Sequence, residues 1–334
     1  MPGLGRFLGE KSVPSHRYTF FYLFGGLALF LVVLQFITGI LLSLYYSPSP
    51  DTANESVRLI ISDVNFGWLV RSIHAWGAHA IVLVVLIHLA STFFMGAYKR
   101  PRELVWVSGL VILFFILGFA FTGYLLPWDT TAYFATQIGT EIPKSLPIVG
   151  ELTVTLLRGG EEIGREALQR MYTIHTILLP LLSIIFISFH VLLQQFVGTS
   201  TPPGYENHGS IRFYPDFLYR DGITWGVMLI IVLGFSTMLP VGVGEKVDPL
   251  ASAPVGIRPE WYFLPLYQTL RMFPAQIASL NGEMIVNIMV ATASASLFFL
   301  PFLPNSRGIR RAMTVLGIIV VSYFTMTIIL AYVT

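Results

Sequence analysis

Seven long apolar segments constrain this 334-residue chain more than any other feature of its sequence. They cover approximately residues 19–46, 68–95, 104–126, 172–198, 223–243, 284–304 and 311–333. Each reaches the roughly 20 apolar residues that an α-helix needs to cross a hydrocarbon core. Charged residues make up only 11% of the chain, against about a quarter in soluble domains. We therefore expect an all-α integral membrane protein with seven spans.

The charges between the spans predict how the chain is oriented. The amino terminus and every second connection carry 11 Lys and Arg against 5 Asp and Glu, with basic clusters at 99–102 and 307–311. The remaining connections carry 9 Lys and Arg against 13 Asp and Glu. Because Lys and Arg accumulate on the cytoplasmic side, we place the amino terminus inside and the carboxyl terminus outside. A net charge of +2 gives no indication of nucleic-acid binding.

Two outer connections, residues 127–171 and 244–283, are long and contain amphipathic stretches punctuated by Pro and Gly. We expect surface helices in them, and long structured loops often carry function. A polar stretch near residues 199–221 separates four spans from three. We predict a four-helix domain at 1–198, an inner connecting loop at 199–222 and a three-helix domain at 223–334.

Four histidines lie inside two of the spans. His74 and His88 are 14 residues apart, and His175 and His190 are 15 apart. Fourteen residues return a helix to within about 40° of its starting face and advance it about 21 Å, so each helix offers one imidazole near each membrane surface. His74 should lie level with His175, and His88 level with His190. Facing imidazoles can be the two axial ligands of a haem iron, although any single one could instead be a buried histidine bonded within the bundle.

Glycines repeat the same interval on the two intervening spans. Gly25 and Gly39 are 14 residues apart, as are Gly109 and Gly123. Glycine allows a flat macrocycle to approach the backbone closely. Packing between helices through small residues is an alternative explanation, but it does not require this interval.

Two arginines precede the outer pair of histidines. Arg71 comes three residues before His74, and Arg170 five residues before His175. Their guanidinium groups could reach the anionic propionates of an outer haem. Ordinary basic residues flanking a span would look similar.

The segment PEWYFLPLYQTLRMF, residues 259–273, lies in the second long outer connection. Glu260 stands among aromatic residues, where partial desolvation would raise its pKa and let it exchange a proton near neutral pH. The competing interpretation is an acid in the aromatic belt at the membrane interface.

Together these motifs resemble cytochrome b of the Rieske/cytochrome b complexes, of either the quinol:cytochrome c or the plastoquinol:plastocyanin type. RSIHAWGAH at 71–79, GYLLPW at 123–128, PEWYF at 259–263, the histidine pairs and the glycines carry the likeness, which covers nearly the whole chain. The resemblance implies two b haems in the 1–198 domain, with His74 and His175 on the outer one and His88 and His190 on the inner one. It also implies a quinol pocket outside, framed by the 130–140 helix and by Tyr124, Pro127, Pro259, Glu260 and Tyr262. Glu260 would accept a quinol proton.

By the same resemblance, one electron passes to a Rieske iron–sulfur protein and then to cytochrome c or an equivalent. The other crosses the two haems to an inner quinone, and the cycle builds a proton gradient. A homodimer in the lipid of a bacterial cytoplasmic membrane is expected. The chain has no cysteine, so it can hold no iron–sulfur cluster or thioether-linked haem by itself. Seven helices rather than eight and the 15-residue interval between His175 and His190 resemble the photosynthetic type, whose b subunit and three-helix subunit would here be fused into one chain. Leu31, however, stands where that type has the cysteine that anchors an extra haem, so the chain resembles a fused seven-helix bacterial form.

The resemblance places the inner quinone site near Gln195, Arg220 and Asp221. Gln195 stands where mitochondrial-type relatives have a histidine, and Arg220 replaces the usual lysine. Gln195 can bond a quinone carbonyl but cannot deliver a proton, which leaves Asp221 as the expected proton-exchanging group. Arg220 and Asp221 could instead be a plain surface pair.

Two other classes of membrane protein remain as alternatives. The cytochrome b anchor of a dehydrogenase or hydrogenase also places histidines on helices, but it would not explain PEWYF or the glycines. A secondary transporter predicts carboxylates and broken helices at mid-membrane, and the span interiors contain essentially none.

Overall fold

The computed structural model describes residues 11–148 and 150–334. Within them, seven helices are long and apolar enough to cross a membrane, which confirms the predicted all-α membrane class and the predicted number of spans. These spans are Thr19–Ser43, Gly67–Phe94, Glu103–Tyr124, Arg165–Val197, Phe213–Met238, Gly282–Phe302 and Arg307–Val333.

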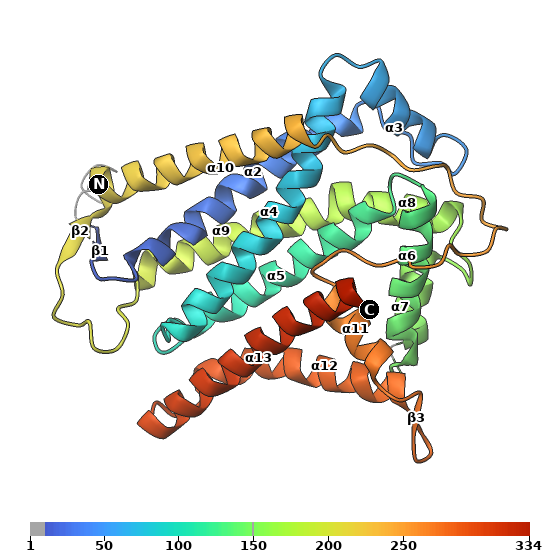
Figure 1. Cartoon of the computed structure of the whole chain (residues 1–334). Coiled ribbons are helices and arrows are strands. Elements are labelled where there is room, and N and C mark those ends of the chain that lie inside the picture. Colours follow the sequence, from blue (N-terminus) through green and yellow to red (C-terminus); the bar gives the residue numbers. More distant parts are fainter. Residues whose placement is uncertain (1–10, 149) are drawn as a thin grey trace. The chain divides into compact units, whose positions relative to one another are not determined.

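Figure 1 shows the elements in chain order. The α-helices are α2 (Leu23–Ser43), α3 (Ala53–Ser62), α4 (Gly67–Phe94), α5 (Glu103–Tyr124), α6 (Thr130–Glu141), α7 (Gly150–Arg158), α8 (Arg165–Thr173), α9 (Leu179–Val197), α10 (Leu218–Met238), α11 (Leu264–Met272), α12 (Gly282–Phe299) and α13 (Arg307–Val333). Short helical turns are η1 (Thr19–Tyr22), η2 (Ile142–Ser145), η3 (Ile174–Leu178), η4 (Phe213–Phe217) and η5 (Leu300–Phe302). Two antiparallel strand pairs complete the list: β1 (Ser12–Pro14) with β2 (Ser210–Arg212), and β3 (Gln276–Ile277) with β4 (Leu280–Asn281).

Two spans differ from their predicted bounds by five residues or more at an end, whereas the other five agree to within four residues. The fourth begins at Arg165 instead of residue 172, because the polar helix α8 continues through η3 into α9, and hydropathy detects only the apolar part. The fifth runs from Phe213 to Met238 instead of 223–243. It ends there because Pro240 disfavours helical geometry at Leu239, which adopts φ −131° and ψ 66°.

The described residues form two compact units. The first comprises the described part of Met1–Leu44 together with Ile61–Ile116 and Ser183–Val241. In it, α2, α4 and α10 pack against one another (Figure 1). Their outward faces expose large apolar side chains such as Ile40, Leu83 and Ile230, as expected where lipid is the solvent.

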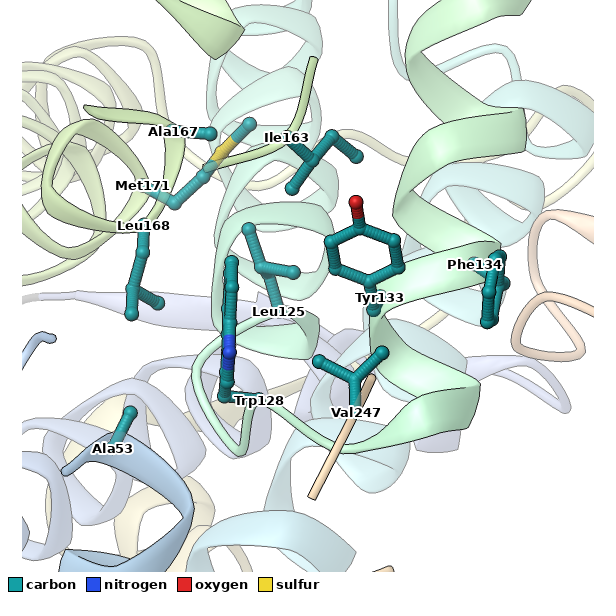
Figure 2. Close-up of a cluster of buried hydrophobic side chains, with 10 residues drawn as sticks. All are labelled: Ala53, Leu125, Trp128, Tyr133, Phe134, Ile163, Ala167, Leu168, Met171 and Val247. Carbon is teal, nitrogen blue, oxygen red and sulfur yellow. The ribbon is translucent and has the colours of Figure 1, made fainter. Parts of the chain in front are cut away.

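The second unit comprises Tyr45–Ile60, Leu117–Leu182 and Gly242–Thr334. Its core, drawn in Figure 2, gathers buried side chains around Trp128 and Tyr133, with Val247 from a distant part of the chain. The Asp129 side chain accepts a hydrogen bond from Ala132 N at 2.9 Å and so caps the start of α6. In the parts of the two long connections that the structure describes, there are helices α6, α7 and α11 and no further span, as predicted.

Candidate functional site

The imidazoles on α4 rest on glycines of α2. A Cβ atom placed on Gly25 would lie 3.3 Å from Cε1 of His88, and one on Gly39 would lie 3.3 Å from Cε1 of His74. Both separations are shorter than ordinary van der Waals contact. The glycines therefore let the histidine rings lie directly against the backbone of the neighbouring helix.

The imidazoles on η3 and α9 repeat this arrangement against α5. A Cβ atom on Gly109 would lie 3.1 Å from Cε1 of His190, and one on Gly123 only 2.6 Å from Cε1 of His175. Each histidine singled out in the sequence is thus paired with one of the four glycines. What the glycines accommodate in the structure is the imidazole ring itself.

Three of these imidazoles also have a hydroxyl beside Nδ1. The pairs are Thr38 with His74 at 2.9 Å, Ser108 with His190 at 2.9 Å, and Thr122 with His175 at 3.1 Å. A histidine whose Nδ1–H is donated to an oxygen keeps the lone pair of Nε2 for a metal. The donor atoms and the glycine cradles therefore fit axial ligation of a haem iron.

A π turn explains the extra residue in the fourth span. His175 lies in η3, a π-helical turn, whereas His74 and His88 share an uninterrupted α-helix. In a regular helix, 15 residues place the second side chain about 100° further round than 14 do. A π turn takes up one additional residue and is frequent at functional sites. With the π turn, the 15-residue interval between His175 and His190 therefore has the same effect on the direction of the two side chains as the 14-residue interval has for His74 and His88.

The two arginines predicted to bind haem propionates both donate hydrogen bonds to backbone carbonyls. Arg71 donates from Nη1 to the carbonyl of Val241. Arg170 donates from Nη1 to the carbonyls of Thr155 at 2.7 Å and Leu156 at 2.9 Å, near the end of α7. Each guanidinium has five donor hydrogens, so one side chain can bond several acceptors at once.

A cavity of about 310 Å³ lies in the second unit, where several candidate quinol-site residues converge. Tyr124 at the end of α5 lines it together with Pro259 and Glu260. The rest of its wall is mostly apolar and comes from α6, η2, α11 and α12, with Phe121 of α5 and Phe263 just before α11. The α12 contribution had no signal in the sequence, because only tertiary contact brings α12 to this place.

Pro127 and Tyr262 are not among the residues that line this cavity. The carbonyl of Pro127 accepts a hydrogen bond from Asn54 Nδ2 at 3.0 Å, which anchors the turn between α5 and α6. Tyr262 is buried, and its burial, reinforced by the nearby Glu260 and Tyr124, raises the pKa of its hydroxyl well above the usual value. Tyr262 therefore stays protonated at physiological pH and can only donate or accept a hydrogen bond there.

The candidate inner quinone residues lie in the first unit. Asp221 on α10 is only 7% exposed and faces Gly26 of α2, where a Cβ atom would lie 2.3 Å from Oδ2. Its neighbour Arg220 is exposed, and no ion pair joins the two within the described chain. Gln195 accepts a hydrogen bond from Lys11 Nζ, whose pKa is lowered by burial. Lys11 was not singled out in the sequence, because nothing local links it to Gln195.

Family models match most of the chain. Residues 8–198 match the model described as "Cytochrome b/b6/petB", and residues 246–334 match "Cytochrome b(C-terminal)/b6/petD". The chain belongs to the cytochrome b family. This confirms the predicted family and makes the protein an integral membrane subunit of an oxidoreductase, from a family that binds haem b.

Individual relatives agree with this assignment. The chain is 43% identical over 324 residues to a cytochrome bc complex cytochrome b subunit of Chlorobaculum thiosulfatiphilum, which covers 95% of this chain and 74% of that protein. It is 40% identical over 205 residues to cytochrome b6 of Heliobacterium modesticaldum, covering 60% of this chain and 96% of that protein. A solved chain of a hyperthermophilic respiratory complex III aligns with a TM-score of 0.81 and 28% identity over 99% of this chain and 96% of its own.

Proposed function

We propose that this cytochrome b is the di-haem subunit of a proton-translocating quinol oxidoreductase. The observation that carries the proposal is the mostly apolar cavity of about 310 Å³, which has Glu260 and Tyr124 in its wall. Ligand sites of this kind combine an apolar surface with a few polar groups that orient the ligand. A quinol ring matches that description, since its body is apolar and its two hydroxyls are polar.

In this proposal the four histidines hold two non-covalent b haems. His74 and His175 would hold the outer haem, Arg71 and Arg170 would bind its propionates, and His88 and His190 would hold the inner haem. The absence of cysteine from the chain supports non-covalent binding. When bound, haem b supplies the one-electron redox centres by which an electron crosses the membrane.

The protein's own residues handle the quinol and its protons. The apolar wall of the cavity excludes water from the ring, and Pro259 forms part of that wall. Glu260 accepts a quinol proton, while Tyr124 orients the hydroxyl by hydrogen bonding. Pro127 holds the turn that carries Tyr124, and Tyr262 supports the position of Glu260.

One electron leaves to a Rieske iron–sulfur protein and on to cytochrome c or an equivalent carrier, and the other reduces a quinone at the inner side. Gln195 and Arg220 bind that quinone and Asp221 supplies protons to it. The naming of one relative as a cytochrome bc complex subunit supports these partners.

The membrane setting follows from the charge distribution. We place the amino terminus inside and the carboxyl terminus outside a bacterial cytoplasmic membrane. The homodimer is proposed from the family resemblance alone. The two family-model matches, 8–198 and 246–334, support a four-helix domain at 1–198 and a three-helix domain at 223–334, joined by 199–222.

Replacement of Glu260 by Gln tests the proposed quinol chemistry. The amide keeps the size of the side chain but cannot take a proton, so quinol oxidation should slow by about 100-fold to 10,000-fold, less where water offers another proton route. The measurement is the rate of quinol-driven haem reduction in the purified complex, with haem content checked by its optical spectrum. Asp248→Asn, an exposed acid of the same connection, is the matched control and should leave the rate unchanged. An unaltered rate in Glu260→Gln would remove Glu260 from the mechanism.

A further inference from the structure

The hydroxyls beside the imidazoles follow a rule of position. Each belongs to the residue immediately before the glycine on which the ring rests: Thr38 before Gly39, Ser108 before Gly109 and Thr122 before Gly123. Each hydroxyl also bonds a carbonyl of its own helix: Thr38 with Leu34 at 2.8 Å, Ser108 with Val105 at 3.0 Å and Thr122 with Gly118 at 2.7 Å. Because its own proton goes to that carbonyl, the oxygen is left to accept the Nδ1–H of the histidine.

The fourth imidazole breaks this rule. The residue before Gly25 is Phe24, whose ring packs on Phe20 and Phe21 at centroid distances of 5.5 and 6.0 Å. Nδ1 of His88 is buried and has no hydrogen-bond partner within the described chain. The backbone geometry is not the cause, since Cβ positions on Gly25 and Gly39 lie at the same distances, 3.3 Å from Cε1 and 3.9 Å from Nδ1, of His88 and His74 respectively.

Because its Nδ1–H has no hydrogen-bond acceptor, the imidazole of His88 is a weaker electron donor to a bound iron. An oxygen that accepts the Nδ1–H bond pushes electron density into the ring and raises the basicity of the ligand. A more basic axial ligand stabilises ferric iron more than ferrous iron and lowers the reduction potential, because axial ligation and hydrogen bonding around it set that potential. His88 lacks this assistance, while His190, its proposed partner on the inner haem, receives it from Ser108.

We propose that Phe24 is a tuning position, which raises the reduction potential of the inner haem by withholding a hydrogen-bond acceptor from His88. Both proposed ligands of the outer haem, His74 and His175, have their hydroxyls. The asymmetry therefore favours electron transfer from the outer haem to the inner one. This inference rests on the proposed ligation of the inner haem by His88 and His190.

The test compares two variants that differ by one hydroxyl. Phe24→Thr introduces an acceptor in the geometry of Thr38, and Phe24→Val is the isosteric control without it. In the purified complex, potentiometric titration followed by optical difference spectra should give a lower inner-haem midpoint in Phe24→Thr than in Phe24→Val. One hydrogen bond corresponds to roughly a tenfold change in the one-electron equilibrium, or about 59 mV. Equal midpoints in the two variants would overturn the proposal.

A converse variant covers the case in which substitution at position 24 disturbs folding. Ser108→Ala removes the hydroxyl acceptor from His190 and leaves the backbone carbonyl of Val105 beside its ring, so it should raise the inner-haem midpoint, and an unchanged midpoint would count against the tuning argument. Failure of the ligation itself looks different. If His88→Leu retained both haem spectra, the proposed ligand assignment would be wrong, whatever the midpoints of the other variants.

Discussion

At the residue scale, Asp221 is a carboxylic acid whose burial is energetically unfavourable. The residue is only 7% exposed, its carboxyl group lies against the backbone of α2 at Gly26, and Oδ1 has no hydrogen-bond partner within the described chain. A buried carboxylate without partners costs several kcal/mol, on the order of 2–7 for an unpaired polar group. Such a cost is commonly retained at functional sites, which supports proton exchange with quinone as the role of Asp221.

Replacement of Asp221 by Asn tests that role. The amide is nearly isosteric but cannot carry the proton, so reoxidation of the inner haem by quinone should slow by an order of magnitude or more, on the scale of general acid–base effects of about 100-fold. Reduction of the haems from the quinol side should be unaffected, and flash or stopped-flow spectroscopy separates the two phases. Asp216→Asn, at a partly exposed acid paired with Arg212, is the control. Normal inner-haem reoxidation in Asp221→Asn would move the proton donor elsewhere.

At the scale of the element, α5 requires glycine where the ring of a neighbouring histidine packs against its backbone. Gly123 would place a Cβ atom 2.6 Å from Cε1 of His175, closer than real Cβ contacts, whereas Gly118 on the same helix would meet only Leu179 at 3.4 Å. The two glycines therefore have different significance. One is required by the imidazole and the other tolerates a methyl group.

This difference predicts contrasting effects of alanine at the two positions. Gly123→Ala should push His175 from its place and abolish or greatly reduce outer-haem binding, while Gly118→Ala should retain both haems. Helix propensity favours alanine over glycine by about 1 kcal/mol at either site, so any loss in Gly123→Ala comes from the clash. Difference spectra of the purified variants give the answer, and full outer-haem content in Gly123→Ala would contradict the packing argument.

The helices also differ in how much of their structure could be predicted from the sequence. Hydropathy identified all seven spans, because a run of roughly 20 apolar residues is rarely found except where a helix crosses a membrane. The repeated intervals of 14 and 15 residues singled out four glycines and four histidines, and the structure places each of these glycines against one of these histidines. Hydropathy did not predict the π turn around His175 or the polar helix α8 at the start of the fourth span, because both depend on helix hydrogen bonding that hydropathy does not record. The hydroxyls beside Nδ1 were equally invisible, since a threonine in a span has no distinctive pattern until its partner is known.

At the scale of the whole molecule, the chain combines two tasks that require different surroundings. Histidine side chains on long apolar helices offer nitrogen ligands inside the membrane, where a charged side chain would be costly. Glu260, in the wall of the cavity proposed to take quinol, instead comes from a connection between spans and is only partly buried. The family resemblance predicts Glu260 and Tyr124 at this site, but the α12 wall of the cavity depends on contacts distant in sequence.

The central claim is that four histidines hold two b haems, one pair at each level of the membrane. Pyridine haemochrome analysis of the purified subunit in its complex, combined with an optical redox titration, measures this directly. The account predicts two equivalents of non-covalent haem b per chain with two distinct midpoints, and loss of only the higher-potential one in His88→Leu. A single equivalent in the wild type, or two retained midpoints in His88→Leu, would contradict it.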